Sequence, residues 1–481
     1  MDLDTLTATD ALARLRAGTL GSEELLDAQL ERVEARNGEL NLVVTRDDER
    51  ARARCREADA ATARGESWGP LHGLPITVKD SFETEGLRTT SGSPTLVDHV
   101  PARDADAVAR LKAAGAIVYG KTNLPLWAGD LQTDNEVFGL SRNPWDPDRT
   151  TGGSSGGAAG AVAAGMTLLE LGSDIGGSIR CPAHYCGIAG HKSSWEAISS
   201  RGHIPGPPGA LAPADLGVMG PLARTVADLE LALEVLVGPD LAGVPGARLP
   251  APSPAAGSLS GLRVGLWAED PAAPTSAETT AALRRLGDDL ADAGVAVDDG
   301  ARPETSSEEL FLLYIELLTA AMAGTFPETS MDRFRSVLAD AGADDLARAQ
   351  ARGALASHGD WLAADERRVA ARAAWDRLFE RVDVVIAPCA PGPAFRHDVE
   401  RPFGRRVLDV DGHEVPYLRH LVWAGVATLP LLPATAVPVG RSAEGLPIGA
   451  QVIGPRWHDR TTLAVARLIE GTTGGFRAPV G

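Results

Sequence analysis

An α/β fold is predicted for this chain, because apolar, β-branched runs alternate with helical patterns along its length. Runs typical of buried strands, at 74–82 and 166–173, are separated by helical segments, and 44% of the 481 residues are hydrophobic. A chain of this length and composition can bury a large core, as one oversized domain or as two domains. We therefore expect a mixed or parallel sheet wrapped by helices.

The N-terminal third predicts two helices and then a strand–helix–strand unit. The first helix begins at Ser22, which is followed by two acidic residues that suit the positive end of a helix dipole. A second helix is expected at 47–64. The strand at 74–82, the helix at 104–114 and the strand at 116–119 then form a β–α–β unit.

The rest of the chain continues the alternation. Small residues at 158–165 predict a tightly packed helix, and we expect a buried strand at 166–173. The proline- and glycine-rich stretch 239–254 is typical of a linker or surface loop. Further elements are predicted as helices at 279–293 and 344–381, a strand at 447–455 and a last helix at 461–470. The middle third carries little sign of chemistry, so we expect it to form a pocket wall or a partner surface.

Charge and hydropathy exclude some classes of protein. The net charge of −19 and the pI of about 5.0 disfavour a nucleic-acid or anionic-membrane surface. No apolar stretch approaches the roughly 20 residues that span a bilayer, and the acidic start lacks the basic region of a signal peptide. We expect a cytoplasmic protein that binds neither nucleic acid nor membrane.

Four cysteines in a chain of this length predict no disulfide framework. Cys181, Cys186 and His191 lie close together and offer soft ligands, but no second cluster completes a usual zinc spacing. We therefore predict no metal site and no cofactor.

Lysine is rare here, with only four among 46 basic residues: Lys79, Lys112, Lys121 and Lys192. A guanidinium stays protonated at any working pH, whereas a buried amine can lose its proton and act as a base. Lys79 lies in the apolar run 74–82, which favours a buried strand that carries the amine inside. The alternative is an edge strand with a solvated lysine.

The first of two glycine–serine clusters spans 152–157 and contains Ser154. A phosphate-binding loop is one interpretation, but Ala158 stands where that motif needs lysine. Gly152, Ser154 and Gly156 also match the nucleophile elbow of α/β-hydrolases, with Ser154 as the nucleophile. That motif needs a strand directly before the serine, and the prolines of 144–150 make a poor one.

The second cluster, 172–180, follows the predicted strand 166–173 directly. Its consecutive N–H groups can curl round an oxyanion, because two glycines permit the turn. Ser178 stands where a nucleophile would. A tight turn with a capping serine is the structural alternative.

Together, the motifs closely resemble those of the amidase signature family. The resemblance runs from about residue 65 to 470, with the landmarks in the family's order. They are Leu71 to Pro75, Val78 to Asp80, Gly120 to Asn123, Arg142 to Asp146, both serine clusters, Arg180 to Ala183, and Gly445 to Pro455.

The resemblance implies one large α/β domain on a mixed, mostly parallel central sheet covered by helices on both sides. It implies a Ser–Ser–Lys triad, with Ser178 as the nucleophile, Ser154 as a bridging serine at a cis peptide, and Lys79 as the base. The implied oxyanion donors are the N–H groups of Ile175, Gly176, Gly177 and Ser178. The substrate pocket falls on Trp127, Ala128, Asp130 and Leu131.

We accordingly predict an N-terminal helical flank at 1–64 and an amidase signature domain at 65–475. Within the domain, the catalytic core is expected at 70–235 and a variable helical pocket wall at about 270–380.

Two functions within this family are compatible with the motifs. A stand-alone amidase would cleave a small-molecule amide, or a carbamate or ester, through an acyl-enzyme, and would act as a monomer or homodimer. The A subunit of glutamyl-tRNA amidotransferase uses the same triad to release ammonia from glutamine, while a second subunit holds the tRNA. The segment 192–199 departs from that subunit's usual sequence, and Glu196 and Ala197 also depart from a glycine-bearing pattern common in stand-alone amidases. We predict the stand-alone amidase. The alternatives are the Ser154 esterase and the amidotransferase subunit.

Overall fold

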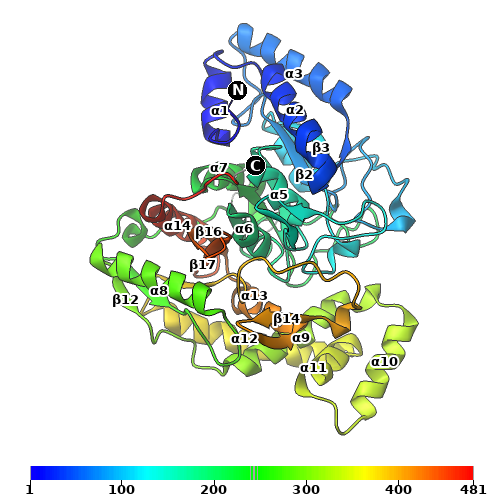
Figure 1. Ribbon diagram of the computed structural model, residues 1–481, viewed down its shortest axis with the longest axis vertical. Coiled ribbons are helices and arrows are strands. Elements are labelled where there is room, and N and C mark those ends of the chain that lie inside the picture. The colour runs from blue at the N-terminus through cyan, green and yellow to red at the C-terminus, as the bar shows by residue number, and fades with distance from the viewer. Residues whose placement is uncertain (1, 239, 242–243, 246, 480–481) are drawn as a thin grey trace.

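The chain folds into a single α/β domain around a large mixed sheet (Figure 1). The computed structural model describes residues 2–238, 240–241, 244–245 and 247–479. The predicted linker 239–254 therefore lies partly outside the described residues, at 239, 242–243 and 246. The domain boundaries 1–64 and 65–475 stay a prediction.

The central sheet has eight strands. From one edge to the other they are β12 (Ala296–Asp298), β11 (Arg263–Leu266), β13 (Val384–Pro388), β17 (Pro447–Ile453), β16 (Ala434–Arg441), β7 (Ala189–Lys192), β8 (Val218–Ala223) and β6 (Leu169–Asp174). A second sheet places β3 (Ile117–Thr122) between β1 (Val43–Arg46) and β2 (Pro75–Lys79). Three hairpins pair β4 (Arg142–Asn143) with β5 (Asp146–Thr150), β9 (Asp240–Leu241) with β10 (Val244–Pro245), and β14 (Val407–Val410) with β15 (His413–Pro416).

The predicted α/β class and the mixed sheet are confirmed, but the expectation of mostly parallel strands is wrong. Among the described strands of the central sheet, only β11 pairs in parallel, with β12 and β13, and the other neighbours are antiparallel. β6 and β7 run in the same direction, as a β–α–β unit predicts, but β8 lies between them and is antiparallel to both. A tight turn at 442–446 makes β16 and β17 antiparallel neighbours.

Most predicted helices form close to their expected limits, and local capping explains where several begin. The side chain of Asp47 accepts a hydrogen bond from the backbone N–H of Arg50 and so caps α3. The predicted helix 344–381 is instead two helices, because Ser357 and Asp360 form a capping box that starts a new one. The α-helices are α1 (Ala8–Arg16), α2 (Ser22–Leu40), α3 (Asp48–Ala63), α4 (Asp106–Ala113), α5 (Gly156–Ala163), α6 (Arg180–Cys186), α7 (Val226–Val237), α8 (Ala277–Asp292), α9 (Ser307–Met322), α10 (Glu328–Ala339), α11 (Asp345–Ala354), α12 (His358–Phe379), α13 (Leu421–Thr428) and α14 (Asp459–Thr473).

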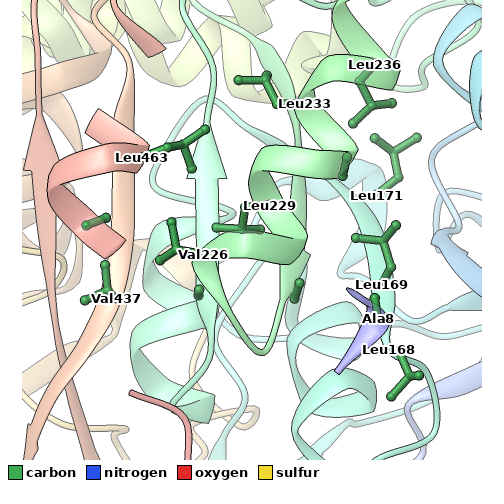
Figure 2. Close-up of a cluster of buried hydrophobic side chains, with 14 of the residues drawn as sticks. Ala8, Leu168, Leu169, Leu171, Val226, Leu229, Leu233, Leu236, Val437 and Leu463 are labelled. Atoms are coloured by element: carbon green, nitrogen blue, oxygen red, sulfur yellow. The ribbon is translucent and has the colours of Figure 1, made fainter. Parts of the chain in front are cut away.

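The core lies on both faces of the central sheet. Figure 2 shows Leu229 and Leu233 of α7 among side chains from β6, β16 and α14. A second cluster packs α9, α12 and α13 against strands β13, β16 and β17 and includes Tyr314 and Trp423. In Figure 1 the N-terminal helices lie at the upper end and α9 to α12 at the lower end, with β2, α5 and α6 between them.

Within the described residues, none of the helices combines the length and apolar character needed to cross a membrane. The cytoplasmic location stays a prediction.

Candidate active site

Lys79 lies at the end of β2, inside the protein. All five residues of β2 are buried, and the strand packs against β6. The Lys79 ammonium Nζ donates hydrogen bonds to the hydroxyl oxygens of Ser154 at 2.7 Å, Ser155 at 2.9 Å and Ser173 at 3.0 Å. The apolar run therefore delivers the amine to the two serine clusters. β2 is an edge strand of the three-stranded sheet, but Lys79 is fully buried, so the alternative of a solvated lysine is wrong.

Burial lowers the pKa of Lys79 to about 7, although the carboxyl groups of Asp174 and Glu170 act in the opposite direction. A charged amine loses hydration when it leaves water, so the protein interior favours its neutral form. An amine with this pKa is present in both protonation states near neutral pH. It can therefore take a proton from a bonded hydroxyl and return it later in a reaction.

Ser154 lies in the glycine-rich loop between β5 and α5. The peptide bond between Gly153 and Ser154 is cis, as the family resemblance implied. A Cβ atom on Gly153 would lie 2.4 Å from the carbonyl oxygen of Asp130, so only glycine fits here. The strand before the loop belongs to a two-stranded hairpin rather than to the central sheet. The nucleophile elbow therefore lacks the context that it requires.

Ser178 follows β6 in the second cluster, and its side chain is almost fully buried. The backbone N–H of Ser155 donates to the carbonyl oxygen of Ser178 at 3.1 Å, which ties the two clusters together. Within the described part of the chain, no hydrogen bond is recorded for the Ser178 hydroxyl. The Lys79–Ser154 half of the expected relay is thus present as a hydrogen bond, while the Ser178–Ser154 half is not.

The buried pair Asp174 and Arg180 shapes the loop that carries Ser178. Arg180 donates to the Asp174 carboxylate through Nε at 3.1 Å and through a terminal nitrogen at 2.9 Å. Burial alone would raise the pKa of Asp174, but the Arg180 guanidinium holds it at about 2. The same carboxylate accepts the backbone N–H groups of Gly177 and Ile179, each at 3.0 Å.

These contacts revise the predicted oxyanion donors. The N–H of Gly177 is directed to Asp174, so it is already engaged in the resting protein. The N–H groups of Ile175, Gly176 and Ser178 have no recorded acceptor among the residues that the structure describes. The sequence analysis treated all the N–H groups of this loop as free. It did not consider that an aspartate three residues before a glycine can accept that glycine's N–H across a turn.

The predicted substrate pocket lies against the first serine cluster. Trp127 and Ala128 both adopt left-handed backbone angles, and the Trp127 N–H donates to the Ser91 carbonyl. The backbone of Asp130 and Leu131 lies directly over Gly153. The structure therefore brings the segment 126–131 to the cis peptide.

The Asp130 side chain is not free to bind a substrate group in the resting protein. Its carboxylate accepts a hydrogen bond from the Tyr417 hydroxyl at 2.9 Å and pairs with Arg406 at 2.5 Å. Both partners are more than 270 residues further along the chain. Asp130 therefore anchors the segment 126–131 to the region around β14.

Three of the four lysines are fully buried: Lys79, Lys121 and Lys192. Burial also lowers the pKa of Lys121 to about 8 and of Lys192 to about 7. Lys121 donates to Thr84 and Thr89, and Lys192 donates to the Leu432 carbonyl at 2.8 Å. Among these buried lysines, the one that donates to the serine hydroxyls of the two clusters is Lys79.

Sequence reasoning missed two serines that contact Lys79. Ser155 directly follows Ser154, and Ser173 begins the second cluster, so their proximity to the motifs was the only available signal. Their hydroxyls accept two of the three hydrogen bonds from Nζ. They hold the amine beside Ser154.

The cysteines make no metal site among the described residues, where no group of three or more His, Cys, Asp and Glu side chains could hold an ion. All four cysteines are free and buried. Cys181 Sγ lies 3.2 Å from the Cys389 carbonyl oxygen, and Cys186 Sγ lies 3.7 Å from that of Thr151.

Comparison with known proteins decides the family. The family model described as Amidase matches residues 24–463. The chain belongs to the amidase family. This confirms the resemblance found in the motifs, and the protein is an amidase-family hydrolase that acts on C–N amide bonds.

Individual relatives of this amidase-family chain narrow the function. It is 37% identical to the A subunit of glutamyl-tRNA(Gln) amidotransferase from Roseiflexus sp. strain RS-1, over 98% of this chain and 97% of the relative. A solved structure of the corresponding Thermotoga maritima protein is 26% identical, with a TM-score of 0.78 over 100% of this chain and 98% of the other. A crystal structure of an amidase is 29% identical, with a TM-score of 0.79 over 98% and 100%.

These relatives overturn the predicted stand-alone amidase. Other curated relatives, at 33–36% identity over almost the whole chain, carry the same subunit name. The alternative, an A-type amidotransferase subunit, is the interpretation that they favour. The prediction relied partly on Glu196, but this residue has a φ of 65° and so occupies the left-handed position that a glycine would take.

The predicted partners are corrected for the same reason. The sequence predicts a small-molecule amide, no nucleic acid, and a monomer or homodimer. The relatives are instead named as one subunit of an enzyme whose name includes glutamyl-tRNA. The net charge of −19 describes this chain alone and does not exclude a tRNA held elsewhere in an assembly.

Proposed function

We propose that this chain is the A subunit of a glutamyl-tRNA(Gln) amidotransferase and releases ammonia from glutamine. The observation that carries the proposal is the match to such proteins at 33–37% identity over nearly the full length of both chains. The site supports it, because hydrolysis of a side-chain amide needs a nucleophile, a base and oxyanion donors. The acidic chain is a poor tRNA surface, so a partner subunit would hold the tRNA.

In the proposed mechanism, Lys79 starts the reaction in its neutral form. Lys79 takes a proton from Ser154, and Ser154 takes one from Ser178, so that the Ser178 oxygen attacks the side-chain amide carbon of glutamine. A C–O bond forms, and the negative charge moves to the amide oxygen. The N–H groups of Ile175, Gly176 and Ser178 would stabilise that charge, at roughly 3 to 4 kcal/mol for a well-placed donor.

The tetrahedral intermediate then collapses. The C–N bond breaks, and the nitrogen leaves as ammonia after receiving the relayed proton. A glutamyl ester on Ser178 remains. Water attacks this ester with the same relay and gives free glutamate. The partner subunit would use the ammonia on glutamyl-tRNA after its carboxylate has been activated by a phosphoryl donor such as ATP, so that the carboxylate oxygen leaves with the phosphate.

The proposed function predicts that glutamine hydrolysis depends on partner subunits. Ammonia and glutamate release would be measured with the chain alone, with the other amidotransferase subunits of the same organism, and with glutamyl-tRNA(Gln) and ATP added, because the carboxylate must be activated before ammonia can displace its oxygen. We expect at least a tenfold gain when the partners are present, together with conversion of glutamyl-tRNA to glutaminyl-tRNA. Ser178→Ala in the same complex is the control for contaminating glutaminase.

Two results would count against the proposal. The first is a complex that assembles but does not hydrolyse glutamine. The second is a chain that fails to bind the partner subunits.

A further inference from the structure

The oxyanion loop is held from outside by a tyrosine of the helical layer. Tyr314 lies on α9, and its hydroxyl is 2.7 Å from the carbonyl oxygen of Ile175. A carbonyl oxygen only accepts hydrogen bonds, so the tyrosine must donate. The side chain of Tyr314 is fully buried, while Ile175 is partly exposed.

The hydrogen bond from Tyr314 restrains the whole peptide unit between Ile175 and Gly176, and not only the carbonyl that it contacts. The Ile175 carbonyl and the Gly176 N–H belong to the same peptide unit, which is planar and directs the two groups in opposite directions. A rotation that moves the carbonyl away from Tyr314 must also turn the N–H. Gly176 has no side chain that would restrict this rotation, so an external contact is needed to hold the plane.

The tyrosine ring itself has little freedom to move. A Cβ on Gly425 of α13 would lie 2.6 Å from a ring carbon of Tyr314, so the ring packs directly on the helix backbone. Leu421, also on α13, packs against Gly176: a Cβ atom added to Gly176 would lie 3.2 Å from the Leu421 side chain. The hydroxyl is therefore presented to the loop by two packed helices.

The hydroxyl also stays protonated over the working pH range. Burial raises the pKa of Tyr314 above its ordinary value, and the Asp174 carboxylate acts in the same direction. The tyrosine thus remains a donor wherever Lys79 is able to act as a base.

We propose that Tyr314 is a positioning residue which orients the Gly176 N–H toward the developing oxyanion by holding the Ile175 peptide plane. This inference rests on the proposed acyl-enzyme chemistry at Ser178. It assigns a role in the reaction to α9, which lies in the region predicted to be a variable pocket wall. A hydrogen bond to the carbonyl also polarises the peptide, so the Gly176 N–H becomes a stronger donor.

Tyr314→Phe removes one oxygen atom and keeps the ring that packs on α13. We expect the rate of Ser178 labelling by a fluorophosphonate to fall about 10- to 100-fold, less than the loss of a whole oxyanion donor. In the assembled complex, kcat for ammonia release should fall by a similar factor, while KM changes less than threefold. A group that acts on the transition state affects kcat in this way.

Tyr119→Phe is the matched control. The Tyr119 hydroxyl is also buried and donates to a backbone carbonyl, that of Met166, which is outside the oxyanion loop. Both variants lose a buried hydrogen bond and should show similar shifts in unfolding midpoint. Only Tyr314→Phe should slow the labelling of Ser178.

Equal labelling rates for the two variants would overturn the inference, as would a raised KM with an unchanged kcat. A wild-type protein that is not labelled at Ser178 would overturn the proposed mechanism and this inference together. If Tyr314→Phe slows labelling while the complex shows no glutaminase activity, the positioning role stands and only the assigned substrate fails.

Discussion

Replacing Ser178 with alanine is expected to lower amide hydrolysis by about 10⁴-fold or more, because no acyl-enzyme can form without the attacking oxygen. The loop should remain folded, since it is held by Asp174 and Arg180 rather than by the Ser178 hydroxyl. The measurement is the initial rate of ammonia release in the assembled complex. The unfolding midpoint of the variant should match that of the wild type.

Ser336→Ala is the control for this experiment. Ser336 is an exposed serine on α10, and its hydroxyl donates to the Asp332 carbonyl within the helix. Its loss should change activity less than twofold. A Ser178→Ala variant that keeps more than about 1% of wild-type activity would show that another group is the nucleophile.

Replacing Lys79 with methionine is expected to lower the rate about 10²- to 10⁴-fold, the range typical of general-base catalysis. The variant should still fold, because methionine fills a buried site without the cost of removing an ammonium from water. The three serine hydroxyls lose a shared donor, and that of Ser155 keeps its contact with the Ser173 carbonyl. We therefore expect a large loss of rate together with a small change in the unfolding midpoint.

The pH profile separates the base from a purely structural lysine. Burial lowers the pKa of Lys79 to about 7, and only the neutral amine accepts a proton. Activity in the wild type should therefore fall as the pH drops through about 7, and this acid limb should be absent from Lys79→Met. A wild-type profile that stays flat down to pH 5 would remove Lys79 as the base. An acid limb that persists in the variant would do the same.

The sequence predicts the local parts of the site well. Lys79 could be found because lysine is rare in this chain and the run around it is apolar. Ser178 could be found because a strand and two glycines surround it. Each of these signals lies within about ten residues of the group concerned, and nearby spacing determines which groups can share a turn.

The rest of the site depends on contacts that local patterns do not encode. Arg406 reaches Asp130 from a distant hairpin, and Tyr314 reaches Ile175 from α9. The carboxylate of Asp174 engages Gly177, although the glycine pattern alone suggested a free donor. Packing decides each of these partners, so only the folded chain reveals them.

Local sequence patterns also did not predict the order of the strands in the sheet or the choice of substrate. The predicted strand–helix–strand unit at 74–119 forms, with β2 and β3 as parallel neighbours, but no local signal indicated that β8 would lie between β6 and β7. The motifs predicted the amidase family, which the family model confirms. They leave open which amine is released.

The most direct test of the site is to identify the residue that forms the covalent adduct. The wild-type protein would be incubated with a fluorophosphonate, digested and analysed by peptide mass mapping, with Lys79→Met treated in parallel. We predict an adduct on Ser178 that forms at least 100-fold more slowly in the variant. An adduct on Ser154, or a labelling rate that Lys79→Met leaves unchanged, would contradict the proposed Ser178–Ser154–Lys79 chemistry.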